Sequence, residues 1–177
     1  MFVVLLGFTT YANYKNDPYK IPKTPGLKGT YGFYNVKEFK FNGETIPYST
    51  TDPNRWQNVV FEKWATISIK VAKPIRPDTT TGDGYYEQDI DRNFESAGVG
   101  GRRYYAYTAD TAGKTILLQN KNKNYRGETY KLSYTQLNDS TIILRGVSEK
   151  KDSIYAELNR ITKKYLLFEG RRKPIKL

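Results

Sequence analysis

The chain has 177 residues, which is enough for one domain with a hydrophobic core, and it contains no histidine and no cysteine. This composition excludes Ser-His-Asp triads, Cys-His pairs, CxxC redox motifs and zinc sites, and no spacing singles out a glycosidase-like carboxylate pair, so we predict neither an enzyme nor a metal or cofactor. The net charge of +11 favours anionic surroundings, such as a phospholipid surface or nucleic acid.

The first segment, MFVVLLGFTTYANY, carries no charge over residues 1–14. It lacks the basic start of a signal peptide, and it is shorter than the roughly 20 apolar residues that span a bilayer. We therefore expect residues 1–14 to be the end of a transmembrane helix that begins upstream of this chain, with Tyr11 and Tyr14 at the level of the lipid headgroups. A first β-strand with one hydrophobic face is the alternative.

A tether is expected next, over residues 15–26. Three prolines and two glycines occur within NDPYKIPKTPGLKG, and this composition cannot continue a helix. We place the globular domain at residues 27–177. Lysines that follow an apolar segment favour the cytoplasmic side of a cell membrane by the positive-inside rule, and we expect the domain on that side.

Within this domain, apolar and polar residues alternate with period two, as in TISIKV, YKLSYTQL and SIYAELNRI. Such alternation is typical of antiparallel strands with one buried and one wet face. The dipeptide Asn42-Gly43 predicts a two-residue hairpin. Similar turn signals divide the domain into nine or ten short strands, which predicts an all-β protein with an antiparallel up-and-down barrel or a sandwich. The expected strands are 31–39, 44–47, 56–61, 65–71, 104–108, 115–119, 130–135, 141–145, 153–159 and 165–168.

Residues 72–103 interrupt the strand pattern with one long irregular insertion. The insertion carries an acidic cluster at Asp83, Glu87, Asp89 and Asp91. Its spacing differs from that of an EF-hand, so we interpret the cluster as a solvated acidic loop rather than a calcium site. The alternative is that it contacts the basic remainder of the domain.

The stretch LKGTYGFYNVKEFKFNGETI resembles the opening strand and hairpin of lipocalin-like domains, in which a Gly-x-Trp triplet begins the first strand. Gly29-Thr30-Tyr31 occupies that place, with tyrosine instead of tryptophan. In this family a basic residue late in the chain packs across the ring and closes the base of the barrel, and the resemblance implies that role for Arg160. It therefore implies an antiparallel barrel of the lipocalin/calycin-like type.

A series of further motifs extends the resemblance over nearly the whole chain apart from the insertion: NDP, GFYNV, DPNRWQNVVFEKWATISI, DTAGKTILL, LRG and YAELNRI. In this order they resemble the soluble C-terminal lipocalin-like domain of DoxX-like multispanning membrane proteins of Bacteroidetes. In such proteins the residues before NDP end the last membrane helix, so the resemblance implies the same place for residues 1–14. It indicates an attachment rather than an activity.

A barrel of this type can hold a small apolar ligand among its aromatic side chains, or the same side chains can fill it. Trp56 and Trp64 lie beside Arg55 and Lys63 in the sequence, and a cation on a tryptophan face could recognise a ligand, although core packing is the commoner role. The residues that we expect to line a ligand cavity are Tyr31, Trp56, Trp64, Tyr105, Tyr107, Tyr134 and Arg160.

Basic residues near both ends suit contact with anionic lipid, with ordinary solubility as the alternative. They are Lys15, Lys20, Lys23, Arg171, Arg172 and Lys173. Basic residues interleaved with aromatic ones, as in GRRYYAY, also resemble a surface for single-stranded nucleic acid. Nine or ten strands are too many for an oligonucleotide-binding fold, so we expect no nucleic-acid partner.

Three functions remain as hypotheses. The first is a non-catalytic accessory or ligand-sensing domain of an integral membrane protein. The second is a free-standing lipocalin-like binder of a small apolar ligand, and the third is a module that binds single-stranded nucleic acid.

Overall fold

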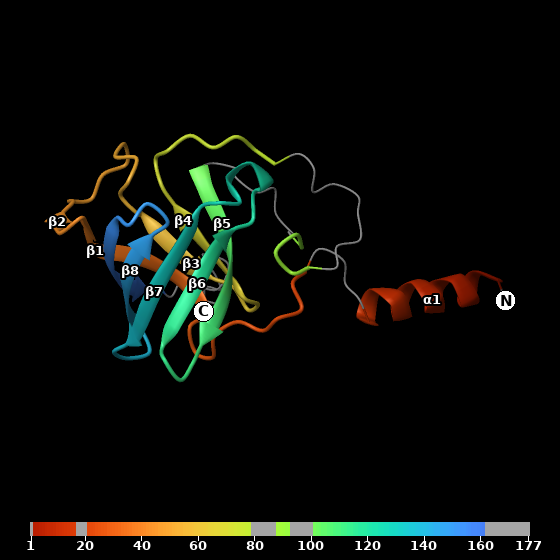
Figure 1. Cartoon of the computed structure of the whole chain (residues 1–177). Helices are drawn as coiled ribbons and strands as arrows, with labels where there is room; N and C mark the ends of the chain where they lie inside the picture. Colours follow the sequence, from red (N-terminus) through yellow and green to blue (C-terminus); the bar gives the residue numbers. More distant parts are fainter. Residues whose placement is uncertain (1, 17–20, 79–87, 93–100, 162–177) are drawn as a thin grey trace, which may run out of the picture.

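The structure is a computed structural model that describes residues 2–16, 21–78, 88–92 and 101–161. One α-helix, α1 (Phe2–Asn16), precedes a body of antiparallel strands (Figure 1). The strands are β1 (Gly32–Phe41), β2 (Glu44–Thr45), β3 (Asn58–Phe61), β4 (Thr66–Lys70), β5 (Arg102–Asp110), β6 (Thr115–Asn120), β7 (Thr129–Gln136), β8 (Thr141–Ser148) and β9 (Ser153–Arg160), with a 3-10 turn, η2 (Lys123–Tyr125), before β7. Nine of the expected strands are confirmed, and the tenth, at 165–168, lies outside the described residues.

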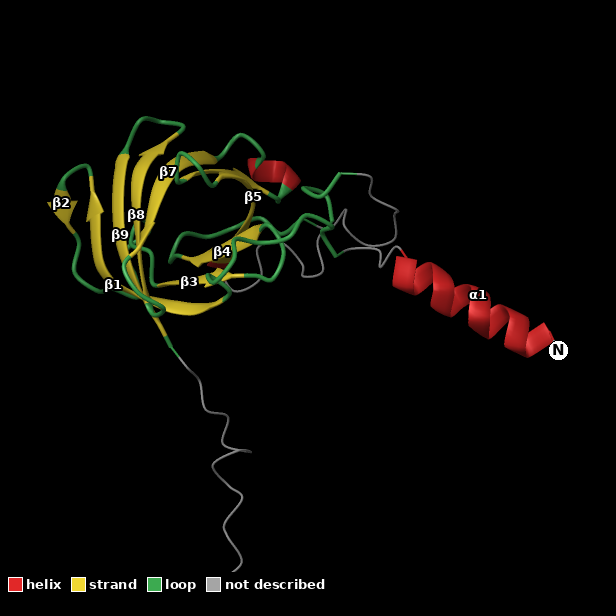
Figure 2. Ribbon diagram, turned by 90° about the horizontal axis from the view of Figure 1, so that it is seen from below, coloured by secondary structure: helices red, strands yellow, loops and turns green. Residues whose placement is uncertain are grey.

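The strands close into a barrel, which Figure 2 shows nearly end-on. Each strand from β3 to β8 pairs antiparallel with the next, β1 pairs with β3, and β9 returns to pair with β1. The short β2 pairs only with the end of β1 and lies outside this ring. Asn42 and Gly43 connect β1 to β2 with φ of 52° and 84°, which is the left-handed conformation that the hairpin requires. The expected all-β antiparallel barrel is confirmed.

The interior of the barrel is packed with apolar side chains that alternate with outward-facing ones along each strand. The core includes Tyr34, Val36, Phe39, Val59, Phe61, Ile67, Ile69, Ile116, Leu118, Leu132, Ile142, Leu144, Ile154, Ala156 and Leu158. A β-bulge between Val36 and Glu38 shifts the alternation in β1, so that Phe39 rather than Glu38 points into the core. Large rings and branched side chains therefore fill most of the interior.

One end of the barrel is closed by the chain that leads into β1. The Gly26 amide donates to the Lys63 carbonyl at 2.9 Å, and the Ala65 amide donates to the Thr24 carbonyl at 2.9 Å. The Leu27 amide donates to the hydroxyl of Tyr107 at 2.7 Å. Residues 24–26, which the sequence places in the tether, thus hydrogen-bond to the barrel wall.

The Gly-x-Tyr triplet that meets Arg160 is Gly32-Phe33-Tyr34, and the assignment to Gly29-Thr30-Tyr31 is wrong. The Arg160 guanidinium lies 5.8 Å from the centre of the Tyr34 ring, and a Cβ on Gly32 would be 2.6 Å from Arg160 Nε. Tyr34 is fully buried, whereas Tyr31 is 50% exposed and has Lys63 over its ring. The structure therefore places Arg160 over Tyr34 rather than over Tyr31.

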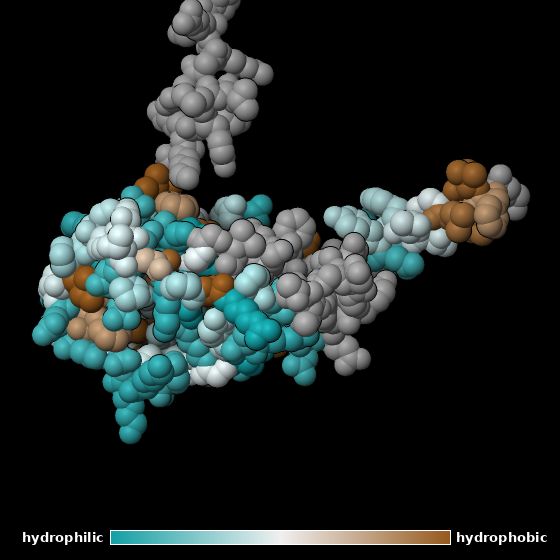
Figure 3. Space-filling view, turned by 90° about the horizontal axis from the view of Figure 1, so that it is seen from above, coloured by the Kyte–Doolittle hydropathy of each residue, from teal (hydrophilic) through white to brown (hydrophobic). Residues whose placement is uncertain are grey.

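Helix α1 exposes large apolar side chains on all sides. Phe2 and Phe8 are 73% and 69% exposed, and the residues between them are exposed as well. Its second half is more polar and carries Lys15 in the last turn, so that hydrophobic surface gathers at the far end of the helix (Figure 3). No helix in the described residues has both the length and the hydropathy needed to cross a membrane.

The described part of the insertion packs on the outer wall of the barrel. Asp91 forms an ion pair with Arg126, and Asp89 accepts hydrogen bonds from the amides of Lys23 and Thr24 at 2.8 and 2.7 Å. These contacts favour the alternative interpretation of the acidic cluster, in which it contacts the rest of its own domain. The other two acidic residues of the cluster, Asp83 and Glu87, lie outside the described residues.

A buried lysine lies beneath this part of the insertion. Lys121 Nζ donates to the Arg92 carbonyl at 2.6 Å and to the hydroxyl of Thr66 at 3.3 Å. Burial lowers the pKa of this amine to about 8, against the weaker opposing attraction of Asp89. Lys121 therefore connects the insertion to β4 through an ammonium group that has little access to water.

Candidate functional site

A small cavity opens at the end of the barrel opposite the chain that closes it. Its volume is about 120 Å³. It lies between the C-terminal ends of β1 and β4 and the N-terminal ends of β5, β7 and β9. Its wall includes the apolar and aromatic side chains of Phe41, Trp56, Ile69, Tyr105, Tyr130 and Ile154 and the charged side chains of Lys73, Arg103, Glu128, Glu149, Lys150 and Asp152.

A chain of aromatic rings forms one wall of this cavity and continues into the core. The Trp56 ring packs edge-on against Tyr130, with 5.7 Å between ring centres, and in a tilted arrangement against Phe39, with 5.6 Å between ring centres. Tyr130 packs in turn against Tyr105 at 5.5 Å. Offset and edge-to-face pairs of this kind hold the rings in defined positions. The cavity therefore has a rigid apolar side.

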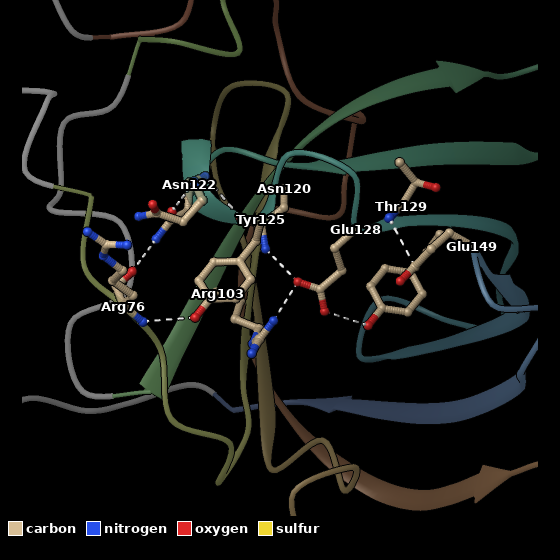
Figure 4. A network of polar contacts seen from close by, with 10 residues as sticks. Arg76, Arg103, Asn120, Asn122, Tyr125, Glu128, Thr129 and Glu149 are labelled. Carbon is tan, nitrogen blue, oxygen red and sulfur yellow. Dashed lines mark hydrogen bonds and ion pairs between the residues drawn. The ribbon is translucent and has the colours of Figure 1, made fainter.

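A carboxylate, Glu128, organises the polar side of the cavity (Figure 4). It accepts hydrogen bonds from Arg103 Nη1 at 2.5 Å, from Asn120 Nδ2 at 2.7 Å and from the Tyr130 hydroxyl at 3.3 Å. The Tyr105 hydroxyl donates to Tyr130. Burial raises the pKa of both phenols above the usual value, so they stay protonated and act as donors. The network contains one carboxylate and one guanidinium.

Arg103 is the cation of this network, and its side chain is only 4% exposed. Burial alone would lower the pKa of its guanidinium, but the attraction of Glu128 raises it above the usual value. The guanidinium also lies 5.1 Å from the centre of the Tyr125 ring. Its Nε and Nη2 atoms are buried and have no hydrogen-bond partner within the described residues. Arg103 is therefore charge-paired on one side and unsatisfied on the other.

The turn η2 holds Tyr125 against Arg103. The Arg76 amide donates to the Tyr125 hydroxyl at 3.0 Å, and Asn122 Nδ2 donates to the Arg76 carbonyl at 2.8 Å (Figure 4). Asp78 accepts from the Lys123 amide at 3.1 Å. The first residues of the insertion thus fix the turn on which one face of the guanidinium rests.

The structure separates the seven residues expected to line a ligand cavity. Trp56 and Tyr105 line it. Tyr107, Tyr134 and Arg160 belong to the closed end of the barrel, on strands whose other ends border the cavity. Tyr31 is largely exposed, and Trp64 pairs with Pro25 on the turn between β3 and β4. These last five residues do not line this cavity, and Tyr107 lines a different pocket together with Leu27 and Ala65.

Of the residues expected to contact anionic lipid, the structure describes Lys15, in the last turn of α1, and Lys23, and both are exposed. Lys20, Arg171, Arg172 and Lys173 lie outside the described residues. The aromatic residues of GRRYYAY do not form a stacking surface for bases. Tyr104, Tyr105 and Tyr107 are all buried, so their rings are not available to an external strand.

Arg103, Glu128 and Tyr130 are among the residues of the site that were not predicted from the sequence. The alternation of β5 and β7 contains the signal for two of them, because residues at even spacings share one face of a strand. If Tyr105 points inward, so does Arg103, and if Leu132 points inward, so does Tyr130. Glu128 precedes β7, and nothing in its local sequence indicates its partners.

We compared the chain with protein-family models, with curated proteins and with solved structures. None of the three comparisons gave a match. The resemblance to the lipocalin-like domain of DoxX-like membrane proteins therefore rests on the sequence motifs alone.

Proposed function

We propose that this chain is a non-catalytic, ligand-sensing β-barrel that α1 holds at a membrane, as an accessory domain of an integral membrane protein. The observation that carries the proposal is the exposure of large apolar side chains around the whole first half of α1. A helix that is apolar on all sides is normally buried, either within a protein or in a lipid bilayer. Full burial of each Val, Leu or Phe side chain is worth about 1.5–3 kcal/mol.

Other features of α1 suit a lipid environment. The hydroxyl of Thr9 donates to the carbonyls of Leu5 and Leu6 at 2.9 and 3.0 Å, so this polar group is satisfied inside the helix. Tyr11 and Tyr14 follow on exposed positions, where amphipathic rings can lie at the headgroup level. Lys15 comes next, close to the charged surface of the leaflet. We place the barrel on the cytoplasmic side for this reason.

The ligand-sensing part of the proposal is supported by the cavity at the open end of the barrel. It combines a rigid aromatic wall around Trp56 with a polar wall around Arg103, and pockets of this composition are typical of small-molecule sites. Its volume of about 120 Å³ is smaller than a drug-sized pocket. A small ligand is therefore the occupant that we propose.

Vesicle flotation of the full chain tests the membrane attachment. We expect the protein to float with phosphatidylcholine vesicles, and more completely when phosphatidylserine is added, since Lys15 then faces an anionic surface. Leu5→Asp introduces a charge into the apolar half of α1 and should abolish most of this binding. Asn13→Asp introduces the same charge into the polar half and is the matched control.

Two results would contradict the proposal. One is a wild-type chain that remains unbound with both kinds of vesicle. The other is equal loss of binding in Leu5→Asp and Asn13→Asp, because attachment would then depend on net charge rather than on burial of the apolar half of α1. Protease accessibility in intact cells reports the side of the membrane.

A further inference from the structure

The guanidinium group of Arg103 is only partly satisfied by its contacts within the described residues. Its Nη1 atom donates to Glu128, and the face of its guanidinium rests on Tyr125. Nε and Nη2 have no partner within the described residues, although both atoms are buried. A buried donor without a partner is costly, and it costs more when the group is charged. Such an arrangement persists when another molecule completes it or when it serves a function.

The two unsatisfied atoms lie on the same edge of the guanidinium group. The hydrogen on Nε and one hydrogen on Nη2 point in parallel, and this edge accepts the two oxygens of a carboxylate in a bidentate pair. Arg103 borders the cavity at the open end of the barrel. A short shift of the guanidinium towards the cavity would present this edge to an occupant while Nη1 keeps Glu128.

We propose that this cavity binds a small monocarboxylate, whose two oxygens accept hydrogen bonds from Nε and Nη2 of Arg103. This inference rests on the proposed ligand-sensing function and names the chemical class of the ligand. The cavity volume of about 120 Å³ equals that of about four water molecules. It suits a carboxylate with about two to four carbon atoms, whose alkyl group contacts the rings of Trp56 and Tyr130.

The charged residues around the cavity favour a ligand that carries a single negative charge. Glu128 lies against the same guanidinium, so the site already holds one carboxylate for one arginine. The remaining wall contains two lysines, Lys73 and Lys150, and two acidic residues, Glu149 and Asp152. A doubly charged phosphate would meet repulsion from Glu128 without a second buried cation. A neutral amide would place an NH₂ group, which is itself a donor, against an arginine donor.

Calorimetric titration of the full chain with propionate tests the proposal. Propionamide, which has nearly the same shape and no charge, is the matched probe, and inorganic phosphate at equal ionic strength is the second. We expect propionate to bind at least tenfold more tightly than either probe, because propionamide loses the charge-assisted bidentate contact and phosphate meets repulsion from Glu128. Fluorescence of Trp56, which lines the cavity, should change with the same midpoint.

Two variants locate the site. Arg103→Lys keeps the positive charge but removes the planar fork, and it should weaken propionate binding roughly tenfold or more. Arg102→Lys makes the same change at the neighbouring residue, which bonds Ser68 and Asn58 on the outer face of the wall, and should leave binding unchanged. If Arg103→Lys does not fold, the comparison of propionate with propionamide on the wild-type chain still decides the proposal.

The possible failures are distinguishable. Equal binding of propionate and propionamide, with no effect of Arg103→Lys, would overturn the carboxylate site while the ligand-sensing barrel stands. Tighter binding of phosphate than of propionate would overturn it as well, since the site would then favour a tetrahedral, more highly charged anion. If propionate, propionamide and phosphate all fail to bind, the carboxylate site is wrong, and the ligand-sensing function loses its support with it.

Discussion

Replacement of Gly32 by alanine tests the account of the closed end of the barrel. Gly32 has a φ of 152°, in a region that residues other than glycine rarely adopt, and a Cβ at this position would lie 2.6 Å from Arg160 Nε. Two separate penalties follow from the substitution. The first is backbone strain, worth about 1–3 kcal/mol. The second is displacement of Arg160 from the Tyr34 ring.

The second penalty can be worked out from the contact that is lost. The Arg160 guanidinium is 5.8 Å from the Tyr34 ring centre and is partly exposed, so the contact is worth about 0.5–1 kcal/mol. Gly32→Ala should therefore lower the free energy of unfolding by about 1.5–4 kcal/mol. In an Arg160→Ala background the clash is absent and only the backbone strain remains. The double-mutant cycle should give a coupling energy of about 0.5–1 kcal/mol.

Urea unfolding, followed by tryptophan fluorescence, measures the four stabilities of this cycle. Gly127→Ala is the control for glycine substitution in general, because a Cβ at Gly127 would meet nothing within 4 Å. A coupling energy below about 0.3 kcal/mol is within normal additivity and would refute the clash with Arg160. A loss below about 0.5 kcal/mol for Gly32→Ala alone would refute the strain as well.

Three further predictions concern charged residues. Lys121 has a pKa of about 8 in the folded chain and 10.5 in the unfolded chain, so the unfolded chain binds more protons between these values and stability rises with pH. From about pH 8 to 9, the wild type should therefore gain about 1 kcal/mol in the free energy of unfolding by urea relative to Lys121→Met, and a difference that does not change with pH would contradict the prediction. Arg55 is 1% exposed and donates to the carbonyls of Trp56 and Val36, so Arg55→Ala should destabilise the fold by about 3 kcal/mol in thermal or urea unfolding. Arg145 also lies beside an aromatic ring but is exposed, so Arg145→Ala should cost under about 1 kcal/mol. Asp89→Asn weakens two hydrogen bonds to the tether, so exchange at the Lys23 and Thr24 amides should accelerate about tenfold by NMR, while Asp110→Asn, in a distant turn, should not change it.

The sequence alone predicts the barrel because alternation is a local property. Leu132 and Tyr134 share a face with Tyr130 in β7 whatever their partners are, and the same rule brings Arg103 to the side of Tyr105. The bulge in β1 is the exception. It turns the Phe39 side chain into the core after Val36, and no residue near the bulge indicates this change in the alternation.

Pairing between distant residues is what the sequence does not reveal. GTY and GFY both match a Gly-x-aromatic triplet, and the choice between them depends on the position of Arg160, on the last described strand. Continuous alternation of Tyr34 with Val36 favours the second triplet and could have decided the matter. The contacts of Asp89 were even harder to predict. Its partners, the amides of Lys23 and Thr24, are about 65 positions away in the sequence, and no motif around them indicates that they bind a carboxylate.

The two ends of the barrel have different roles in this structure. Residues 24–27, which follow α1 in the chain, hydrogen-bond at the closed end, and the cavity beside Arg103 lies at the opposite end. In the attachment that we propose, the chain that follows α1 leads from the membrane to the closed end, and the opening beside Trp56 stays available to ligands in water. The charged rim, which contains Lys73 and Lys150, suits an aqueous approach better than an approach from lipid. A water-soluble ligand such as a small carboxylate fits this arrangement, whereas a lipid that leaves the bilayer would reach the barrel at the end that is closed.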